Sequence, residues 1–309
     1  MTVENYAKVY PLIYEVFQGG LIRPDDITDP DTSRFMPTKR GTSIADQIAS
    51  LIVVNLRQGV NIAPLLLEGN VRIYPSNSCL RIISTEMEGE PIGIDRYAEA
   101  YAAGAVLYVQ LLEHSVGSKL IRKELPDHLN EFIKYMENAE PKDLRLITNH
   151  SATFTSQVRS VFRLQAELVI SDILPVKEPK KASNLLGKMP YFDQKVTHIQ
   201  DKHPAFASWL AQGKKFTPNT WTKVECGRTV VKVNRHGTVH SFGPYLKRAV
   251  QTICTPSATD FLLTYKMPKY PSAVVNGCIE EGVFDYLQMG RLRPEKAKYY
   301  NFTIQEGII

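Results

Sequence analysis

Apolar residues at helical spacing dominate the first 175 residues and favour a mainly helical fold for this part of the chain. Ile44, Ile48 and Ile52 recur every four positions and would share one helix face, and Gly59 is expected to end that helix. Residues 97–112 are rich in Ala, Tyr and Leu and apolar on most sides, so we predict a central, buried helix there. Two further helices are predicted near residues 126–138 and 153–174.

Local signals predict where the first long helix begins and where a hairpin lies. Ser43 is expected to be the N-cap of that helix, with Asp46 reaching back to the free amide groups. Residues 71–74 and 80–84 alternate briefly between apolar and polar side chains, and the sequence Pro-Ser-Asn-Ser lies between them. This pattern predicts a two-stranded antiparallel hairpin.

The pattern changes in the last third of the chain, where short alternating segments replace helical spacing. Trp221–Cys226, Thr229–Asn234 and Thr238–Phe242 are predicted strands, joined by tight turns at Gly227 and Gly237. Short helices are expected on either side of them. The expected fold class is therefore α+β, with a mainly helical N-terminal domain and a C-terminal domain that has a small antiparallel sheet and flanking helices.

The length and one Lys/Pro-rich stretch together predict the domain division. A chain of 309 residues exceeds the size at which single cores usually stop growing, so two domains are expected. Residues 175–190 contain three prolines and four lysines, a composition typical of a linker. We therefore predict an acidic, mainly helical domain over residues 1–175, a linker over residues 176–190 and a basic α+β domain over residues 191–309.

Charge is distributed unevenly along the chain. Residues 177–270, which we call the basic block, hold 16 Lys and Arg against 5 Asp and Glu, a net charge of +11. Residues 1–176 have a net charge of −5, so the total of +5 conceals the segregation. The basic block also contains both tryptophans, Trp209 and Trp221. Positive charge interleaved with aromatic residues is typical of a region that contacts a polyanion.

Several segments of the basic block are candidates for contact with nucleic acid. Asn234–Gly237 fits a hairpin turn, and the helix expected after Pro244 would offer its N-terminal amide groups to an anion. Phe216 or Trp221 would stack on a base while nearby lysines neutralise phosphates. The alternative is a solvated hairpin tip with both aromatic residues in a core. The predicted contact residues are Lys180, Lys181, Lys214, Lys215, Trp221, Lys223, Lys232, Arg235, Lys247 and Arg248.

His236 and His240 suggest a different function, a phosphoryl-transfer or nuclease-like enzyme. Clustered histidines can attack phosphorus and orient a leaving group, and this pair superficially resembles the cluster of histidine-triad phosphohydrolases. The spacing is four residues, Gly237 interrupts it, and a third histidine is lacking. Phosphate-cradling loops and the common hydrolase and kinase motifs are also lacking. We therefore expect a protein that is not an enzyme, without cofactor or metal.

Cysteine usage and hydropathy predict the compartment. The four cysteines are scattered without a C-x-x-C pair and are expected to be reduced; they are Cys79, Cys226, Cys254 and Cys278. The apolar stretches are far shorter than the roughly 20 residues that span a bilayer. The first 20 residues do not resemble a signal peptide. We therefore expect no membrane partner and a location in the cytoplasm or in an intracellular or virion assembly, without secretion.

These features favour a non-enzymatic protein that binds single-stranded RNA or DNA through residues 180–250 and self-assembles into a homo-oligomer, as nucleoproteins do. The acidic N-terminal half would meet the basic block of a neighbouring copy. One alternative is a structural subunit of a virion or phage-type particle, whose basic region faces packaged nucleic acid or an acidic partner. The enzyme that uses His236 and His240 is the other alternative.

Overall fold

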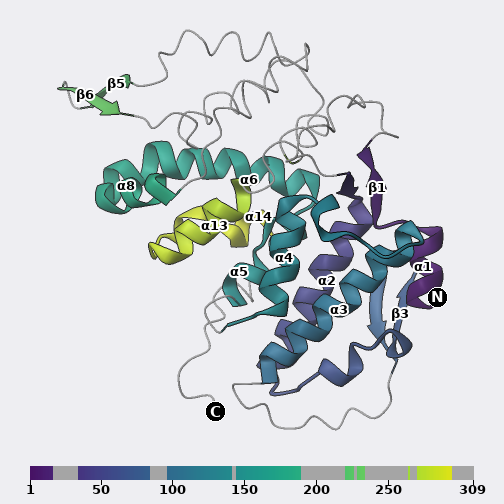
Figure 1. The fold of residues 1–309 in the computed structure, drawn as a ribbon. Helices are drawn as coiled ribbons and strands as arrows, with labels where there is room; N and C mark the ends of the chain where they lie inside the picture. Colours follow the sequence, from purple (N-terminus) through teal and green to yellow (C-terminus); the bar gives the residue numbers. More distant parts are fainter. Residues whose placement is uncertain are drawn as a thin grey trace. The chain divides into compact units, whose positions relative to one another are not determined.

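The computed structural model describes most of the predicted helical part and two strands of the basic block. The described residues are 1–16, 34–83, 96–140, 144–188, 220–225, 228–233, 264 and 270–293. They form a mainly helical α+β fold with small antiparallel sheets, the expected class (Figure 1). The chain divides into two compact units: unit 1 comprises Met1–Thr155 and Arg293–Ile309, and unit 2 comprises Ser156–Leu292. Within the described residues, no helix combines the length and apolar content that crossing a bilayer requires.

Helices form most of the described part of unit 1, and α3 lies at the centre of its core (Figure 1). The helices are α1 (Val3–Val9), α2 (Lys39–Arg57), α3 (Arg96–Val116), α4 (Asp127–Glu137) and α5 (Leu144–Thr148). α3 packs against α1, α2 and α4, and its residues Tyr101 and Tyr108 are fully buried. Ile48 and Ile52 of α2 approach α3 so closely at Gly104 that a β-carbon there would crowd both side chains. The predicted central helix over residues 97–112 is confirmed.

α2 begins earlier than predicted, at Lys39, and its N-cap is Thr38. The Thr38 hydroxyl accepts a hydrogen bond from the backbone N–H of Gly41 at 3.1 Å and lies 3.1 Å from the carbonyl oxygen of Leu12, to which it donates. Ser43 therefore lies inside the helix, and its prediction as N-cap was wrong. The local pattern at Ser43 fits a cap, but the contact with Leu12 selects Thr38 instead.

Two small antiparallel sheets belong to unit 1. β1 (Ile13–Glu15) pairs with β2 (Phe35–Pro37), and β3 (Val71–Tyr74) pairs with β4 (Cys79–Ile82). The second pair is the hairpin predicted from the alternating pattern, which is confirmed. Short 3-10 turns lie between the helices and strands of unit 1, at Ala63–Leu65, Glu68–Asn70, Arg122–Glu124 and Ser151–Thr153.

Helices also form most of the described part of unit 2. They are α6 (Ser156–Leu168), α7 (Leu174–Lys177), α8 (Pro179–Lys188), α13 (Tyr270–Glu280) and α14 (Met289–Leu292), with a π-helical turn at Val169–Ile173 and a 3-10 turn at Phe284–Leu287. Within this unit, α13 packs against α6 and α8. The remaining described elements are the strands β5 (Thr220–Glu225) and β6 (Arg228–Val233).

The segment predicted as a linker, residues 176–190, contains α8. Pro179 is the first residue of this helix, a position where the missing amide proton of proline costs nothing. Ala182 and Leu185 are buried, so α8 has an apolar face despite its lysines. The division of the chain into domains at this segment stays a prediction.

Candidate nucleic-acid interface

β5 and β6 form an antiparallel hairpin in the middle of the basic block. The sequence predicted strands over Trp221–Cys226 and Thr229–Asn234, and both strands are present with their ends displaced by one residue. The register pairs Trp221 with Lys232, Lys223 with Val230, and Glu225 with Arg228. Residues 226 and 227, which separate the two strands, lie outside the described part of the chain, and so does the turn expected at Gly227.

The register assigns the residues of this hairpin to two unlike faces. Paired residues of antiparallel strands share a face of the sheet, and successive residues along a strand alternate between faces. Trp221, Lys223 and Lys232, three of the predicted contact residues, therefore occupy positions on one face. Arg228 occupies the same face, opposite Glu225. The positions of the other face hold only threonine and valine: Thr220, Thr222, Val224, Thr229, Val231 and Val233.

Arg228 is a cationic residue of this face that the sequence did not predict as a contact. The predicted strands, Trp221–Cys226 and Thr229–Asn234, left Arg228 in the connection between them. Only the observed pairing of Arg228 with Glu225 assigns it to the face of Trp221. The cationic positions of the face are thus Lys223, Arg228 and Lys232.

The other predicted contact residues either lie on α8 or fall outside the described part of the chain. Lys180 is exposed, and Lys181 pairs with Glu178 at 3.7 Å between Nζ and Oε2. Such an exposed pair contributes little to stability, so Lys181 remains able to exchange its partner. The residues outside the described ranges are Lys214, Lys215, Arg235, Lys247 and Arg248, together with His236 and His240 of the enzyme hypothesis.

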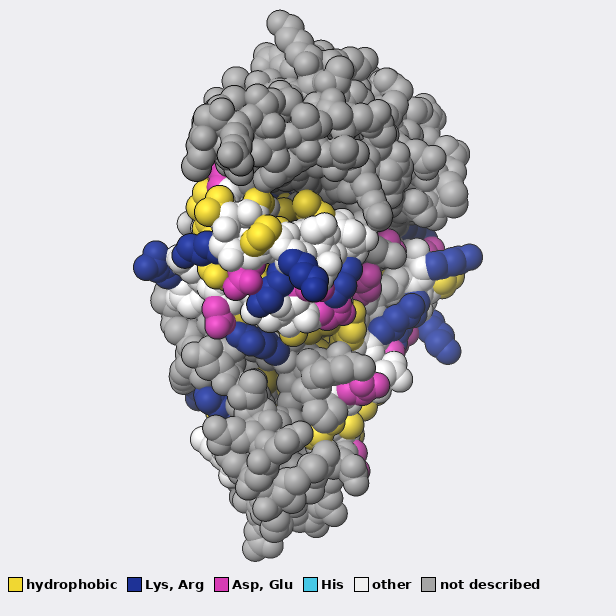
Figure 2. Space-filling view, turned by 90° about the vertical axis from the view of Figure 1, so that its left-hand side faces the viewer, with side chains coloured by type: hydrophobic (Ala, Val, Ile, Leu, Met, Phe, Trp, Pro, Cys, Tyr) yellow, Lys and Arg dark blue, Asp and Glu magenta, His cyan; other side chains and the backbone are white. Residues whose placement is uncertain are grey.

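Ion pairing reduces the positive charge around α8. Lys188 lies between two carboxylates at the end of α13, with its Nζ atom 2.9 Å from Glu280, the last residue of the helix, and 2.6 Å from Glu281, which follows it. On the face that Figure 2 shows, the described Lys and Arg side chains are interspersed with Asp and Glu. The lysines of α8 are therefore weaker candidates for phosphate contact than the cationic positions of the hairpin.

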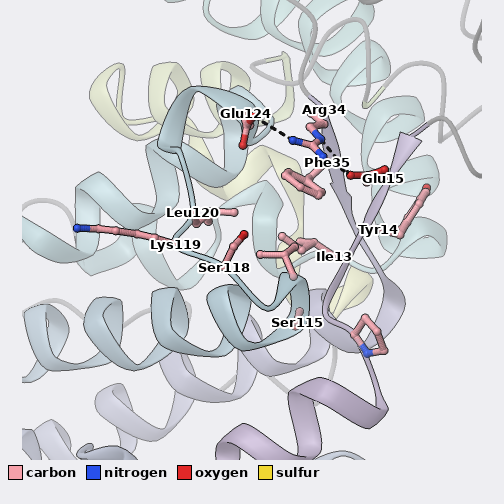
Figure 3. Close-up of a pocket in the computed structure, with 12 residues that line it drawn as sticks. Ile13, Tyr14, Glu15, Arg34, Phe35, Ser115, Ser118, Lys119, Leu120 and Glu124 are labelled. Atoms are coloured by element: carbon pink, nitrogen blue, oxygen red, sulfur yellow. Dashed lines mark hydrogen bonds and ion pairs between the residues drawn. The ribbon is translucent and has the colours of Figure 1, made fainter. Parts of the chain in front are cut away.

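Unit 1 contains a pocket of about 270 Å³ between the β1–β2 sheet and the end of α3 (Figure 3). The guanidinium of Arg34 lies between two carboxylates there, with Nε 3.0 Å from Glu15 and Nη1 3.4 Å from Glu124. The hydrogen bond to Glu15 is the main cause that raises the pKa of Arg34. The pocket is lined by Pro11, Ile13, Tyr14, Glu15, Arg34, Phe35, Ser115, Val116, Ser118, Lys119, Leu120 and Glu124.

The described lining of this pocket carries few groups for catalysis. Among the described residues that line it, no histidine or cysteine lies beside the two serines. Its carboxylates are engaged with Arg34, which neutralises them. Among the described residues, no group of three His, Cys, Asp or Glu side chains is arranged to hold a metal ion. The hairpin is therefore the better supported candidate site.

The chain matches no protein-family model, and it matches neither a curated protein nor a solved structure. The two observations that bear on function are the segregation of charge along the sequence and the register of β5 and β6.

Proposed function

We propose that this protein binds single-stranded nucleic acid, without catalysing a reaction, through the basic region of residues 180–250. The observation that carries the proposal is the register that pairs Trp221 with Lys232 and assigns Lys223 to the same face. An aromatic ring flanked by cations is the combination that single-strand binding sites use: the ring stacks on a base, and the cations neutralise phosphates. The net charge of +11 in the basic block supplies the surrounding attraction.

The same face favours a single strand over a duplex. Stacking on an aromatic ring needs an unpaired base, because the bases of a duplex are already stacked on one another. The hairpin has one aromatic position on this face, Trp221. Stacking of this ring on a base tolerates any base and does not read base edges. The protein would therefore bind many sequences with similar affinity.

The proposal extends to self-assembly. In this layout, the mainly helical and acidic residues 1–175 form an assembly domain, and residues 191–309 form the α+β domain that contacts nucleic acid. The net charges of −5 for residues 1–176 and +11 for the basic block are complementary between neighbouring copies. A homo-oligomer on a nucleic-acid strand, of nucleoprotein type and located in the cytoplasm or in an intracellular or virion assembly, would use both surfaces.

Replacing Trp221 by alanine is expected to weaken binding to a single-stranded oligonucleotide by about 5- to 150-fold, which corresponds to about 1–3 kcal/mol of stacking. Trp221→Phe keeps an aromatic ring and should therefore retain most of the wild-type affinity. Lys232→Ala should reduce the slope of log K against log salt concentration by about 0.7 in magnitude, as expected for the loss of one phosphate contact. Fluorescence anisotropy with a labelled oligonucleotide between 50 and 200 mM salt, a range of strong salt dependence, measures all three.

Lys134→Ala is the matched control, because Lys134 is an exposed lysine on α4 in the acidic half. It removes the same charge as Lys232→Ala and should leave both the affinity and its salt dependence close to those of the wild type. Binding that is absent, or that does not change with salt, would contradict the proposed function. Equal losses in Lys134→Ala and Lys232→Ala would refute the hairpin as the site.

Self-assembly is tested separately by size-exclusion chromatography with light scattering. The expected result is a mass of several chains at low salt that increases further with the oligonucleotide and falls towards one chain at high salt, because charge pairing between copies is screened. A mass of one chain under every condition would contradict assembly and leave the binding proposal to the anisotropy experiment.

A further inference from the structure

The β3–β4 hairpin of unit 1 carries two arginines directly opposite one another. Its register pairs Arg72 with Arg81 and Tyr74 with Cys79, so these four residues share one face of the hairpin. The alternate positions are buried in the core of unit 1: Val71, Ile73 and Leu80. The face with the arginines therefore points away from the core, and Arg81 and Tyr74 are exposed on it.

Neither arginine has a carboxylate partner among the described residues. Nη1 of Arg72 donates to the carbonyl oxygens of Gly69 at 3.0 Å and Val71 at 2.9 Å. The guanidinium of Arg81 lies over the ring of Tyr74, 5.2 Å from the ring centroid. Like charges directly opposite one another on antiparallel strands destabilise the pair. An anion between the two guanidinium groups would remove this repulsion.

The hairpin is held rigidly against the core of unit 1. The side-chain amide of Gln47 on α2 accepts from the backbone N–H of Leu80 at 2.8 Å and donates to the carbonyl oxygen of Ser78 at 2.8 Å. The hydroxyl of Tyr6 on α1 donates to the hydroxyl of Ser78 at 2.7 Å. A ligand on the outer face would therefore meet backbone that is already ordered, which lowers the entropic cost of binding.

We propose that the outer face of the β3–β4 hairpin is a second contact for single-stranded nucleic acid, in which Arg72 and Arg81 hold a backbone phosphate and Tyr74 stacks on a neighbouring base. The planar donors of a guanidinium match the oxygens of a phosphate. The ring of Tyr74 is part of a side chain that is 47% exposed, and aromatic rings beside cations are typical of single-strand binding sites.

This contact rests on the proposed function and extends it to the acidic half of the chain, outside residues 180–250. An acidic surface of another copy would also neutralise the two arginines, but it would not use the exposed ring. A nucleic-acid strand uses both the charge and the ring, so it is the occupant that this face fits better.

The salt dependence of binding to a labelled oligothymidylate, longer than the footprint of one chain, tests the contact on the full-length protein. Arg72→Gln and Arg81→Gln should each reduce the slope of log K against log salt concentration by about 0.7 in magnitude, and the double variant by about 1.4. Tyr74→Leu should weaken binding about fivefold or more through the loss of stacking. Fluorescence anisotropy measures all of these.

Arg122→Gln is the matched control, because Arg122 is a surface arginine of unit 1 that is already paired with Glu137. It should leave the slope at the wild-type value. Urea unfolding separates binding from folding: Arg81→Gln relieves the repulsion from Arg72, so it should not lower the unfolding midpoint. Wild-type slopes in the Arg72 and Arg81 variants, or an equal reduction in Arg122→Gln, would overturn the second contact.

Photo-crosslinking to a 4-thiothymidine oligonucleotide locates the contact independently. Trypsin cleaves after Arg72 and after Arg81, so residues 73–81 are released as one peptide that contains Tyr74. We expect this peptide to carry crosslinked nucleotide in the wild-type protein. Crosslinks that form elsewhere in the chain but not on this peptide would overturn the contact.

The variants of the two hairpins distinguish failure of this contact from failure of the proposed function. A slope that changes in Lys232→Ala but not in the Arg72 and Arg81 variants would refute only the contact at β3–β4. The opposite result would refute the β5–β6 hairpin as the site and support the contact at β3–β4. A lower oligomer mass in the double variant, with an unchanged slope, would assign the face to another copy and overturn the contact. Absence of any binding would contradict both proposals.

Discussion

Replacing Gly41 by alanine is expected to destabilise unit 1 by about 3 kcal/mol, although alanine is the better helix former. Gly41 lies in the first turn of α2, where the helix passes directly over the backbone of Leu12. A β-carbon at this position would overlap the carbonyl oxygen of Leu12 and lie 3.0 Å from its carbonyl carbon. The obstacle is backbone, which cannot rotate away, so α2 or the Leu12 segment must move.

Moving that segment would also disturb the start of α2. The carbonyl oxygen of Leu12 accepts a hydrogen bond from the backbone N–H of Thr38 at 2.8 Å, and the Thr38 hydroxyl donates to the same oxygen. Urea unfolding followed by circular dichroism measures the loss. Gly69→Ala is the control in the same unit, because a β-carbon there would meet nothing within 4 Å. The control should change stability by less than about 0.5 kcal/mol, and equal effects would contradict the close approach at Gly41.

Unit 1 is expected to lose about 2–3 kcal/mol of stability between pH 6.5 and pH 4.5 through His150 alone. His150 is fully buried, and burial lowers the pKa of its imidazole from 6.5 to about 3. Its Nδ1 atom accepts a hydrogen bond from the backbone N–H of Ala152 at 3.2 Å, so the neutral ring carries its proton on Nε2. Protonation would place a second donor against that N–H.

The direction of the pH dependence follows from the protonation of His150 in the folded and in the unfolded protein. Above about pH 6.5 the ring is neutral in both the folded and the unfolded protein, and the full stability is present. Below it, the unfolded chain binds a proton that the folded protein does not take up until its own pKa of about 3. The free energy of unfolding therefore falls as the pH falls through this window, by about 1.4 kcal/mol per pH unit at most.

His150→Asn isolates this contribution. Asparagine keeps an acceptor for the turn that His150 caps, but it does not titrate and loses the ring contacts with Phe132 and Tyr135. The variant should be less stable than the wild type at pH 7, with a flatter dependence of the free energy of unfolding on pH. Urea unfolding at pH 7.0, 5.5 and 4.5 (values that bracket the window) measures both. Parallel curves for the two proteins would exclude His150 as the cause.

Local patterns predicted those features of the fold that depend on nearby residues. Ile44, Ile48 and Ile52 are all fully buried, as their spacing required, because a helix places every fourth residue on the same face. The alternation that marked the β3–β4 and β5–β6 hairpins is likewise a property of adjacent positions. The prediction of Ser43 as the N-cap of α2 was wrong because the contact of Thr38 with Leu12, which is distant in the sequence, determines where the helix begins.

The sequence likewise predicted only those parts of the candidate site that depend on nearby residues. The basic block and Trp221 are visible in composition, and the register of the hairpin adds Arg228 to their face. The buried ion pair of Arg293 with Asp46 carried no signal in the sequence, since the two residues are 247 positions apart. His150 also went unmarked, because it belongs to a polar run, Thr148–Thr153, that composition alone would place at the surface.

The sequence by itself determined the helical character of unit 1, the hairpins and the segregation of charge, because each follows from the spacing or sum of neighbouring residues. Only the tertiary structure decided that Gly41 must lack a side chain, that His150 is buried and neutral, and that Arg293 is buried with its guanidinium against Thr153. These properties arise where segments far apart in the sequence come into contact. Burial, close approach and ion pairing at such contacts depend on both partners, and neither partner alone encodes them.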